Sequence, residues 1–141
     1  MLLQPRKTKF AKTHKGRNRG MAAKGARICF GSYGIKALEN GFITAKQIET
    51  IRVLLNRICG KTGNIWIRIF PDKPITRKPL GVRMGSGKGN VEYWAAPVKP
   101  GVILFEIDGV AENDIVKTAN IVRDKLQIKV SLEKKKNVLY E

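Results

Sequence analysis

The stretch from Lys73 to Asn90, KPITRKPLGVRMGSGKGN, constrains the fold of this chain more than any other segment. It holds five cationic side chains and no acid, and glycines and prolines interrupt it. Proline removes a backbone donor and glycine weakens regular structure, so the stretch predicts a loop rather than a helix or a central strand. Strand-like runs flank it, at Ile65–Phe70 and Val91–Val98. A basic loop of this length is typical of a functional element with a polyanionic partner, with a flexible solvated loop as the alternative.

The charge of the whole chain is equally uneven. Its 141 residues include 28 Lys and Arg against 11 Asp and Glu, a formal net charge of +17. Residues 1–100 hold 21 of the basic and 4 of the acidic side chains, and residues 101–141 hold 7 of each. The net charge therefore lies within the first hundred residues. Self-repulsion on this scale indicates a protein that binds an anionic surface such as nucleic acid.

Residues 1–27 carry nine basic side chains and no acid. Their few large apolar residues follow neither a helical nor an alternating period, so this segment cannot form a core by itself. We expect an extended RNA-binding arm that follows phosphates, with a solvated tail as the alternative. His14, the single histidine, is a candidate for contacts with nucleic acid and has no partners for a metal site.

Residues 28–132 predict one α+β domain, with two helices on a mostly antiparallel sheet. A capping box of Thr44 and Gln47 begins the first helix and Gly60 ends it. A second helix is predicted over 112–125, where acids precede and bases follow an apolar stripe. The apolar residues at helical spacing in the first helix are Ile48, Ile51, Leu55 and Ile58.

The strands are predicted from short apolar or alternating runs. A turn at Lys99-Pro100-Gly101 joins two of them, which indicates an antiparallel hairpin of 91–98 with 102–107. The tail, 133–141, is expected to be frayed. The predicted strands span residues 28–33, 65–70, 91–98, 102–107 and 128–132.

Two pairs of residues allow a structural and a chemical interpretation. Tyr93 and Trp94 are expected to be core residues, because aromatic residues in strands usually are, with base stacking as the alternative. Cys29 and Cys59 lie in apolar segments without CxxC spacing. We expect them to be buried free thiols rather than a disulfide.

The glycine-rich loop does not match the known phosphate-binding spacings. In a Walker loop counted back from Gly87-Lys88, Val82 replaces the first glycine and Gly89 replaces the hydroxyl residue. A dinucleotide fingerprint fails at Asn90. With its one histidine in the arm, the chain cannot position a nucleophile and a base. We therefore expect no catalytic residues, no cofactor, no metal and no small-molecule substrate.

Several segments carry a resemblance to a known family. The most specific reads IWIRIFPDKPITRKPLGVRMGSGKGNVEYW, and the others are QPRKTKFAKTHKGRNRG, FGSYGIKAL, ITAKQIE and KPGVILFEIDGV. Together they closely resemble large-subunit ribosomal protein L-sixteen of bacteria and organelles, from the first residues to about Val110. The second helix matches in pattern, and the tail after Leu132 is individual to this chain.

The resemblance implies an α/β-hammerhead type of α+β fold and a non-catalytic constituent of the large ribosomal subunit. In that family the arm packs into 23S-type ribosomal RNA. The basic loop points towards tRNA in the aminoacyl site near the peptidyl-transferase centre, with the peptidyl site left open. Carried over to this chain, the rRNA-binding residues are Arg6, Lys7, Lys9, Lys12, His14, Lys15, Arg17, Asn18 and Arg19. The residues of the loop near tRNA are Lys78, Arg83, Met84, Gly85, Gly87, Lys88 and Gly89.

The implied partners are therefore ribosomal RNA, tRNA and neighbouring large-subunit ribosomal proteins. The implied location is a ribosome in a bacterial cytoplasm, a mitochondrial matrix or a plastid stroma. The alternative function is a free-standing basic module that binds RNA or an anionic membrane surface. No apolar run approaches the roughly 20 residues that span a bilayer, so we expect no membrane partner.

Overall fold

The computed structural model describes residues 3–135. It confirms an α+β fold, and every strand pair in the described part of the chain is antiparallel. No helix within that part is long and apolar enough to cross a membrane. The elements, in chain order, are β1 (Tyr33–Ala37), β2 (Gly41–Thr44), α1 (Ala45–Cys59), β3 (Asn64–Ile67), β4 (Lys73–Arg77), β5 (Asn90–Val98), β6 (Ile103–Asp108), α2 (Glu112–Lys125) and β7 (Val130–Lys134).

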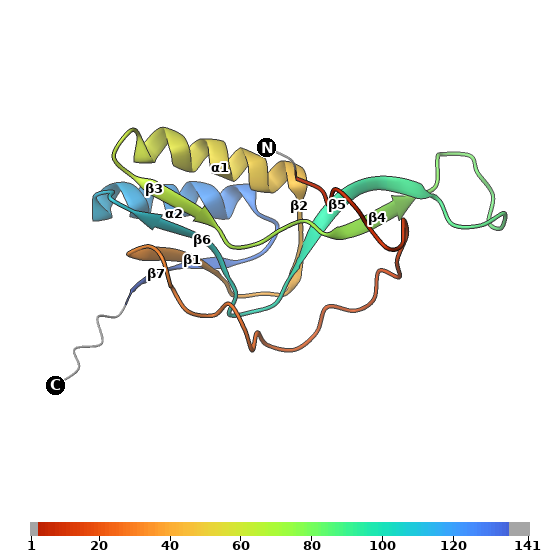
Figure 1. The fold of residues 1–141 in the computed structure, drawn as a ribbon, viewed down its shortest axis with the longest axis horizontal. Coiled ribbons are helices and arrows are strands. Elements are labelled where there is room, and N and C mark those ends of the chain that lie inside the picture. The colour runs from red at the N-terminus through yellow and green to blue at the C-terminus, as the bar shows by residue number, and fades with distance from the viewer. Residues whose placement is uncertain (1–2, 136–141) are drawn as a thin grey trace.

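The strands form two sheets. One has four strands in the order β3-β6-β1-β7, and the other has three in the order β2-β5-β4. In Figure 1 both helices lie on the same side of the four-stranded sheet, while β4 and β5 extend away from the helices and end in the long loop. The N-terminal arm begins beside the first turn of α1, where Leu3 lies near Ala45 and Glu49, and its later part runs along the side of the molecule away from the helices (Figure 1). The fold thus separates a helix-covered core from a hairpin that holds the loop.

The core fills the space between the helices and the four-stranded sheet. Ile48, Ile51 and Leu55 of α1 are buried there with Phe105 of β6, as the helical spacing predicts. The last position of the stripe differs, because Cys59 is buried and the predicted Ile58 is only half-buried. Ile43 of β2 and Ala96 of β5 belong to the same core, so the three-stranded sheet is covered in part.

Local signals at the ends of the helices are confirmed. The Thr44 N–H donates to Gln47 Oε1 at 2.9 Å, and the Gln47 N–H donates to Thr44 Oγ1 at 3.2 Å. Gly60 caps the other end of α1, with φ of 58°. Helix α2 spans Glu112–Lys125, which are the bounds predicted from the sequence. Capping chemistry and apolar periodicity are short-range, so the sequence alone carries them.

The predicted hairpin of 91–98 with 102–107 is wrong. Strand β5 pairs with β2 and β4, whereas β6 pairs with β1 and β3 in the other sheet. Residues 103–107 are all buried, so β6 needs a central place between two strands under the helices. Glu92, Tyr93 and Pro97 of β5 are exposed. The turn at 99–101 therefore carries the chain from one sheet to the other.

The prediction that the loop begins at residue 73 is also wrong. Lys73–Arg77 form β4, which pairs with β5 and lies at the edge of its sheet. A proline such as Pro74 is compatible with an edge strand, because the missing N–H need not meet a neighbour there. The loop itself therefore comprises residues 78–89, between β4 and β5.

Several other boundaries and burials differ from expectation. The predicted strand over 28–33 is wrong, because β1 begins at Tyr33 and the residues before it bind a side chain instead of a strand partner. Strand β3 stops at Ile67, three residues early. Strand β7 spans Val130–Lys134, so the tail expected to fray from 133 begins inside a strand, and its residues 136–141 lie outside the described part.

The predictions that both cysteines and both aromatic residues of β5 are buried hold only in part. Both thiols are free as expected, but only Cys59 is buried and Cys29 is exposed. Tyr93 is 39% exposed, so it is not a core residue, and Trp94 is half-buried. The half of β5 next to the loop, residues 90–94, has no fully buried side chain, whereas Ala95 and Ala96 farther along the strand are buried.

Candidate nucleic-acid interface

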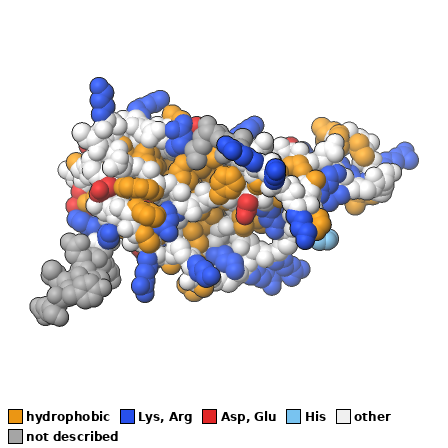
Figure 2. Space-filling view, viewed as in Figure 1, with side chains coloured by type: hydrophobic (Ala, Val, Ile, Leu, Met, Phe, Trp, Pro, Cys, Tyr) orange, Lys and Arg blue, Asp and Glu red, His pale blue; other side chains and the backbone are white. Residues whose placement is uncertain are grey.

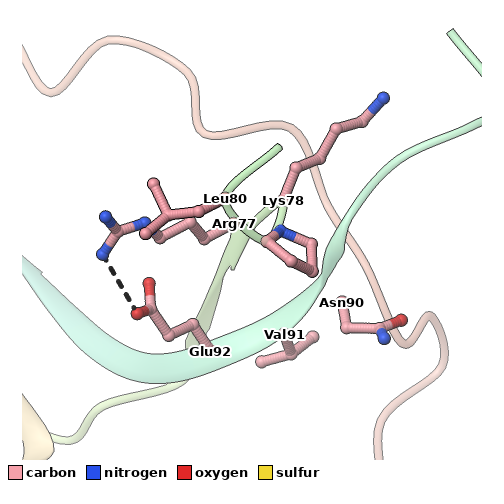
Figure 3. Close-up of a pocket in the computed structure, with 7 residues that line it drawn as sticks. Arg77, Lys78, Leu80, Asn90, Val91 and Glu92 are labelled. Atoms are coloured by element: carbon pink, nitrogen blue, oxygen red, sulfur yellow. Dashed lines mark hydrogen bonds and ion pairs between the residues drawn. The ribbon is translucent and has the colours of Figure 1, made fainter. Parts of the chain in front are cut away.

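The loop 78–89 is held at its neck by the two strands that it joins. Arg77 pairs with Asn90 in the ladder, and Arg77 Nη1 lies 3.4 Å from Glu92 Oε1. Figure 3 shows this pair pointing toward each other beside an open hollow at the neck, while Lys78 extends away from them. The hollow is lined by Arg77, Lys78, Pro79, Leu80, Asn90, Val91 and Glu92.

The glycines of the loop have two separate structural reasons. Gly81, Gly85 and Gly87 have φ of 81°, 100° and 88°, which side chains rarely adopt. Ser86 between two of them also has positive φ, at 56°, a conformation that costs about 1–2 kcal/mol for a residue with a Cβ. At Gly89 a Cβ would lie 2.5 Å from the Arg77 carbonyl oxygen, so only glycine fits against β4.

The loop exposes large apolar side chains from its neck to its tip. Leu80 is 94% exposed, Met84 is 97% exposed and Val82 is 54% exposed. Arg83 makes no hydrogen bond or ion pair with any residue from 3 to 135. Apolar side chains gathered on a projecting element are typical of a surface that another molecule covers.

The arm and the loop hold each other. Lys12 Nζ donates to the Lys88 carbonyl at 3.0 Å, and Lys88 Nζ donates to the Thr13 carbonyl at 2.6 Å. Within the loop, Lys78 Nζ donates to the Gly85 carbonyl at 2.6 Å. A carbonyl oxygen satisfies an ammonium donor but does not neutralise its charge. The two segments predicted separately from the sequence therefore form one cationic surface.

The rest of the arm is fixed along the three-stranded sheet. Asn18 Nδ2 donates to the Val98 carbonyl at 2.6 Å and to the Gly41 carbonyl at 3.1 Å. Lys15 Nζ and Lys73 Nζ each lie 5.8 Å from the centre of the Phe42 ring. Such cation–π contacts hold ammonium groups on the surface without cancelling their charge.

The predicted contact residues are accessible. In the arm all nine are exposed except Asn18, which is half-buried, and in the loop all seven are exposed except the half-buried Lys78 and Gly89. The six ion pairs within residues 3–135 use other basic residues, from Lys36 to Lys134, and none uses a cation of these two sets. Figure 2 shows many Lys and Arg side chains around the loop and the lower edge of the molecule, with few acidic ones among them.

One buried carboxylate was missed by the sequence analysis. Glu106 of β6 is fully buried, and its Oε2 accepts the backbone N–H groups of Phe30 at 2.6 Å and Gly31 at 2.9 Å. The Cys29 N–H also donates to it, at 3.1 Å, and Arg68 forms an ion pair with its Oε1. The only available signal was a single acid within the apolar run VILFEI.

These contacts set the protonation state of Glu106. Burial by itself would raise the pKa of this carboxyl group, but the backbone N–H donors and the Arg68 guanidinium outweigh burial and hold the pKa below its ordinary value. Glu106 is therefore a permanent anion at neutral pH that ties the end of the arm to β6. No group of three or more His, Cys, Asp or Glu in residues 3–135 could hold a metal ion.

Comparison with known proteins places these features in a family. The family model described as ribosomal protein L16p/L10e matches residues 5–133. Two similar curated relatives, from Aeromonas hydrophila subsp. hydrophila and Aeromonas salmonicida, are both named large ribosomal subunit protein uL16. Each is 60% identical over 111 residues, which cover 79% of this chain and 81% of the relative.

Proposed function

Since the chain belongs to the ribosomal protein L16p/L10e family and is a structural constituent of the large ribosomal subunit, not an enzyme, we propose that its arm binds the subunit's RNA and its loop contacts tRNA. The arm contacts 23S-type ribosomal RNA and the loop contacts aminoacyl-site tRNA near the peptidyl-transferase centre. As an extension of this proposal, the same loop surface also contacts peptidyl-site tRNA.

The observation that carries the proposal is the set of cations without carboxylate partners. The basic residues of the arm and loop make no ion pair within residues 3–135, although the fold pairs six other basic residues with acids. Exposed cations without such partners attract phosphates, and the release of counterions from RNA drives their binding. This pattern supports an RNA-binding surface over an ordinary solvated one.

The arm is suited to ribosomal RNA because it is long, extended and already placed. Its cations from Arg6 to Arg19 are exposed, and Asn18 anchors the end of this run on the three-stranded sheet. An anchored arm loses less conformational entropy on binding than a free tail. We assign the arm to packing within the subunit, next to neighbouring large-subunit proteins.

The loop is suited to a ligand that enters and leaves. It projects beyond the sheets, its neck is fixed by β4 and β5, and its tip presents Arg83 beside Met84. Arg83 would bind a phosphate, and Met84 would pack on a ribose or base. The loop would lower the repulsion between tRNA and ribosomal phosphates, which assists accommodation without any chemical step.

A photocross-linking experiment tests the contact with tRNA. A benzophenone amino acid replaces Met84 in chains assembled into large subunits, with the same group at the exposed Val116 of α2 as the control. We expect adducts with aminoacyl-site tRNA from position 84 and none from position 116. Adducts from position 84 with ribosomal RNA alone would assign the loop to RNA packing.

Sedimentation through sucrose gradients at rising salt tests the contact with ribosomal RNA. The chain should migrate with large subunits when the salt concentration is high enough to remove non-specifically bound basic proteins. Release at low ionic strength, with no preference for ribosomal RNA, would favour a free-standing basic module. We assign the protein to ribosomes of a bacterial cytoplasm, with a mitochondrial matrix or a plastid stroma as the alternatives.

A further inference from the structure

A second exposed feature lies on the face of the four-stranded sheet that the helices do not cover. Phe105 and Ile107 of β6 belong to the core beneath the helices, so Glu106 between them points to the opposite face. Trp66 of β3 is paired with Glu106 in the register and lies on that same face. Phe30, three residues after the arm, stacks on Trp66 with ring centres 6.0 Å apart and planes 22° apart.

The backbone under the Phe30 ring is held with unusual firmness. Three consecutive N–H groups, those of Cys29, Phe30 and Gly31, converge on the carboxylate of Glu106. Arg68 completes the set by pairing with the same carboxylate. A buried carboxylate is costly unless it is fully bonded, so these four contacts specify one position for the segment. The Phe30 ring is therefore preorganised.

The ring that this arrangement fixes remains open to solvent. Phe30 is 58% exposed, and the Arg68 guanidinium carbon lies 5.1 Å from its centre. Shielding of the ion pair between Arg68 and Glu106 explains the covered part of the ring. It does not explain why more than half of a rigidly held aromatic side chain faces outward.

Charge around the ring favours an anionic partner. Arg27 is exposed and lies three residues before Phe30, and Lys135 Nζ lies 3.4 Å from the Cys29 carbonyl. Neither cation forms an ion pair with a carboxylate within residues 3–135. A fixed aromatic face with one cation at the adjoining backbone and another three residues away in the chain suits an unpaired nucleotide, because the base can stack and the cations can bind its phosphates.

We propose that Phe30 is a stacking platform for an unpaired base of RNA, with Arg27 and Lys135 at the flanking phosphates and Glu106 as the positioning residue. The inference rests on the proposed RNA-binding function and adds a contact region apart from the arm cations and the loop. Its ligand is single-stranded RNA, such as a base that projects from the folded RNA of the subunit.

The test compares two probes with the full-length chain: a short oligoadenylate, and an abasic oligonucleotide of the same length that keeps the phosphates. Phe30→Leu keeps an apolar cover over the ion pair but removes the aromatic face, whereas Phe30→Tyr keeps that face. We expect Phe30→Leu to weaken binding of oligoadenylate by about five- to a hundredfold. Phe30→Tyr should restore it, and the affinity for the abasic probe should change in neither variant.

Two results would overturn the inference. One is equal binding of oligoadenylate by the wild type and Phe30→Leu; the other is an equal loss for the abasic probe, which would show a general defect. Failure of the wild type to bind either probe would instead remove the RNA-binding function itself. An experiment without a variant provides a second check: RNA containing 5-iodouridine should cross-link to Phe30, and adducts confined to residues 3–19 and 78–89 would contradict the platform.

Discussion

Lys12 and Lys88 lie 76 residues apart in the sequence, and each donates a hydrogen bond to a backbone carbonyl of the other's segment. We call these two hydrogen bonds the clasp. The ammonium group of Lys12 binds the carbonyl of Lys88 at 3.0 Å, and that of Lys88 binds the carbonyl of the residue after Lys12 at 2.6 Å. Because each lysine holds the other segment, we expect RNA that binds the arm to change the restraints on the loop as well. The clasp thus links the segment assigned to ribosomal RNA with the segment assigned to tRNA.

Breaking the clasp should loosen both segments. Lys88→Met removes one of the two bonds, and a hydrogen bond from a charged group to an exposed partner is worth about 1 kcal/mol, or about fivefold in an opening equilibrium. Hydrogen exchange of amides in residues 12–14 and 82–89 should accelerate by about that factor. Lys117→Met, at an exposed lysine of α2, is the matched control and should leave both segments unchanged. Equal exchange in the wild type and Lys88→Met would show that the clasp is not populated.

The arm should divide into two parts with different effects on stability. Deletion of residues 1–16 removes five cations, the partial packing of Leu3 on the core and the two exposed hydrogen bonds with Lys88, so the free energy of unfolding should fall by about 1 to 2 kcal/mol. Deletion of residues 1–27 also removes the Asn18 bonds and the bond from the Ile103 N–H to the Gly25 carbonyl. That deletion should cost about 2 kcal/mol more.

Denaturant unfolding of the two truncated chains measures this difference. If both truncations cost the same small amount, the bonds of residues 18–25 contribute nothing to the fold. If deletion of residues 1–16 costs as much as the longer deletion, the first part of the arm belongs to the fold rather than to an RNA-binding extension.

The salt dependence of RNA binding should report the number of phosphates neutralised. For the full chain we expect a slope of log affinity against log salt of about −5 to −7, which corresponds to about eight to ten phosphates. Deletion of residues 1–16 removes five cations, so the slope should become shallower by about 3 to 4. A slope near zero for the full chain would contradict the electrostatic account.

Glu106 should contribute stability that depends on pH. Its native pKa lies below the ordinary value, so its contribution is fully present above the pKa of about 4.3 that an unfolded glutamate has, and is lost as the pH falls through the native pKa. Glu106→Gln leaves Arg68 without its partner and should cost about 3 kcal/mol at pH 7. The difference between the wild type and this variant should shrink in acid.

Glu92→Gln provides the control for that experiment, because Glu92 forms an exposed pair with Arg77 and should cost less than about 1 kcal/mol. Denaturant unfolding of the three chains between neutral and acidic pH makes the comparison. A difference between the wild type and Glu106→Gln that stays constant with pH would show that the carboxylate is not the group that matters.

The sequence predicted what depends on neighbouring residues and missed what depends on distant ones. The capping box at Thr44 and the bounds of α2 follow from short-range chemistry, and both are confirmed. Strand partners depend on the whole fold. The predicted hairpin across 99–101 and the prediction that residues 73–77 belong to a loop were therefore wrong. For the same reason nothing in the sequence placed Lys12 beside Lys88.

The site followed a similar division. Composition and motif indicated the arm and the loop as cationic segments, because charge is visible in a sequence. The carboxylate of Glu106 was invisible, since its partners at Cys29, Phe30 and Gly31 come from a segment about 75 residues earlier. Because the N–H groups of residues 29–31 donate to Glu106, this segment does not form the strand that its apolar sequence had predicted.

The most direct measurement of the central claim is the affinity of aminoacyl-site tRNA for ribosomes whose large subunits carry Arg83→Ala. The matched control is Arg123→Ala, at an exposed arginine of α2 far from the loop in the chain. We expect normal assembly of both variants and a loss of tRNA affinity of about tenfold for Arg83→Ala alone. Unchanged tRNA affinity in assembled Arg83→Ala ribosomes would contradict the account, and Arg83→Ala subunits that fail to form would assign the loop to the packing of ribosomal RNA.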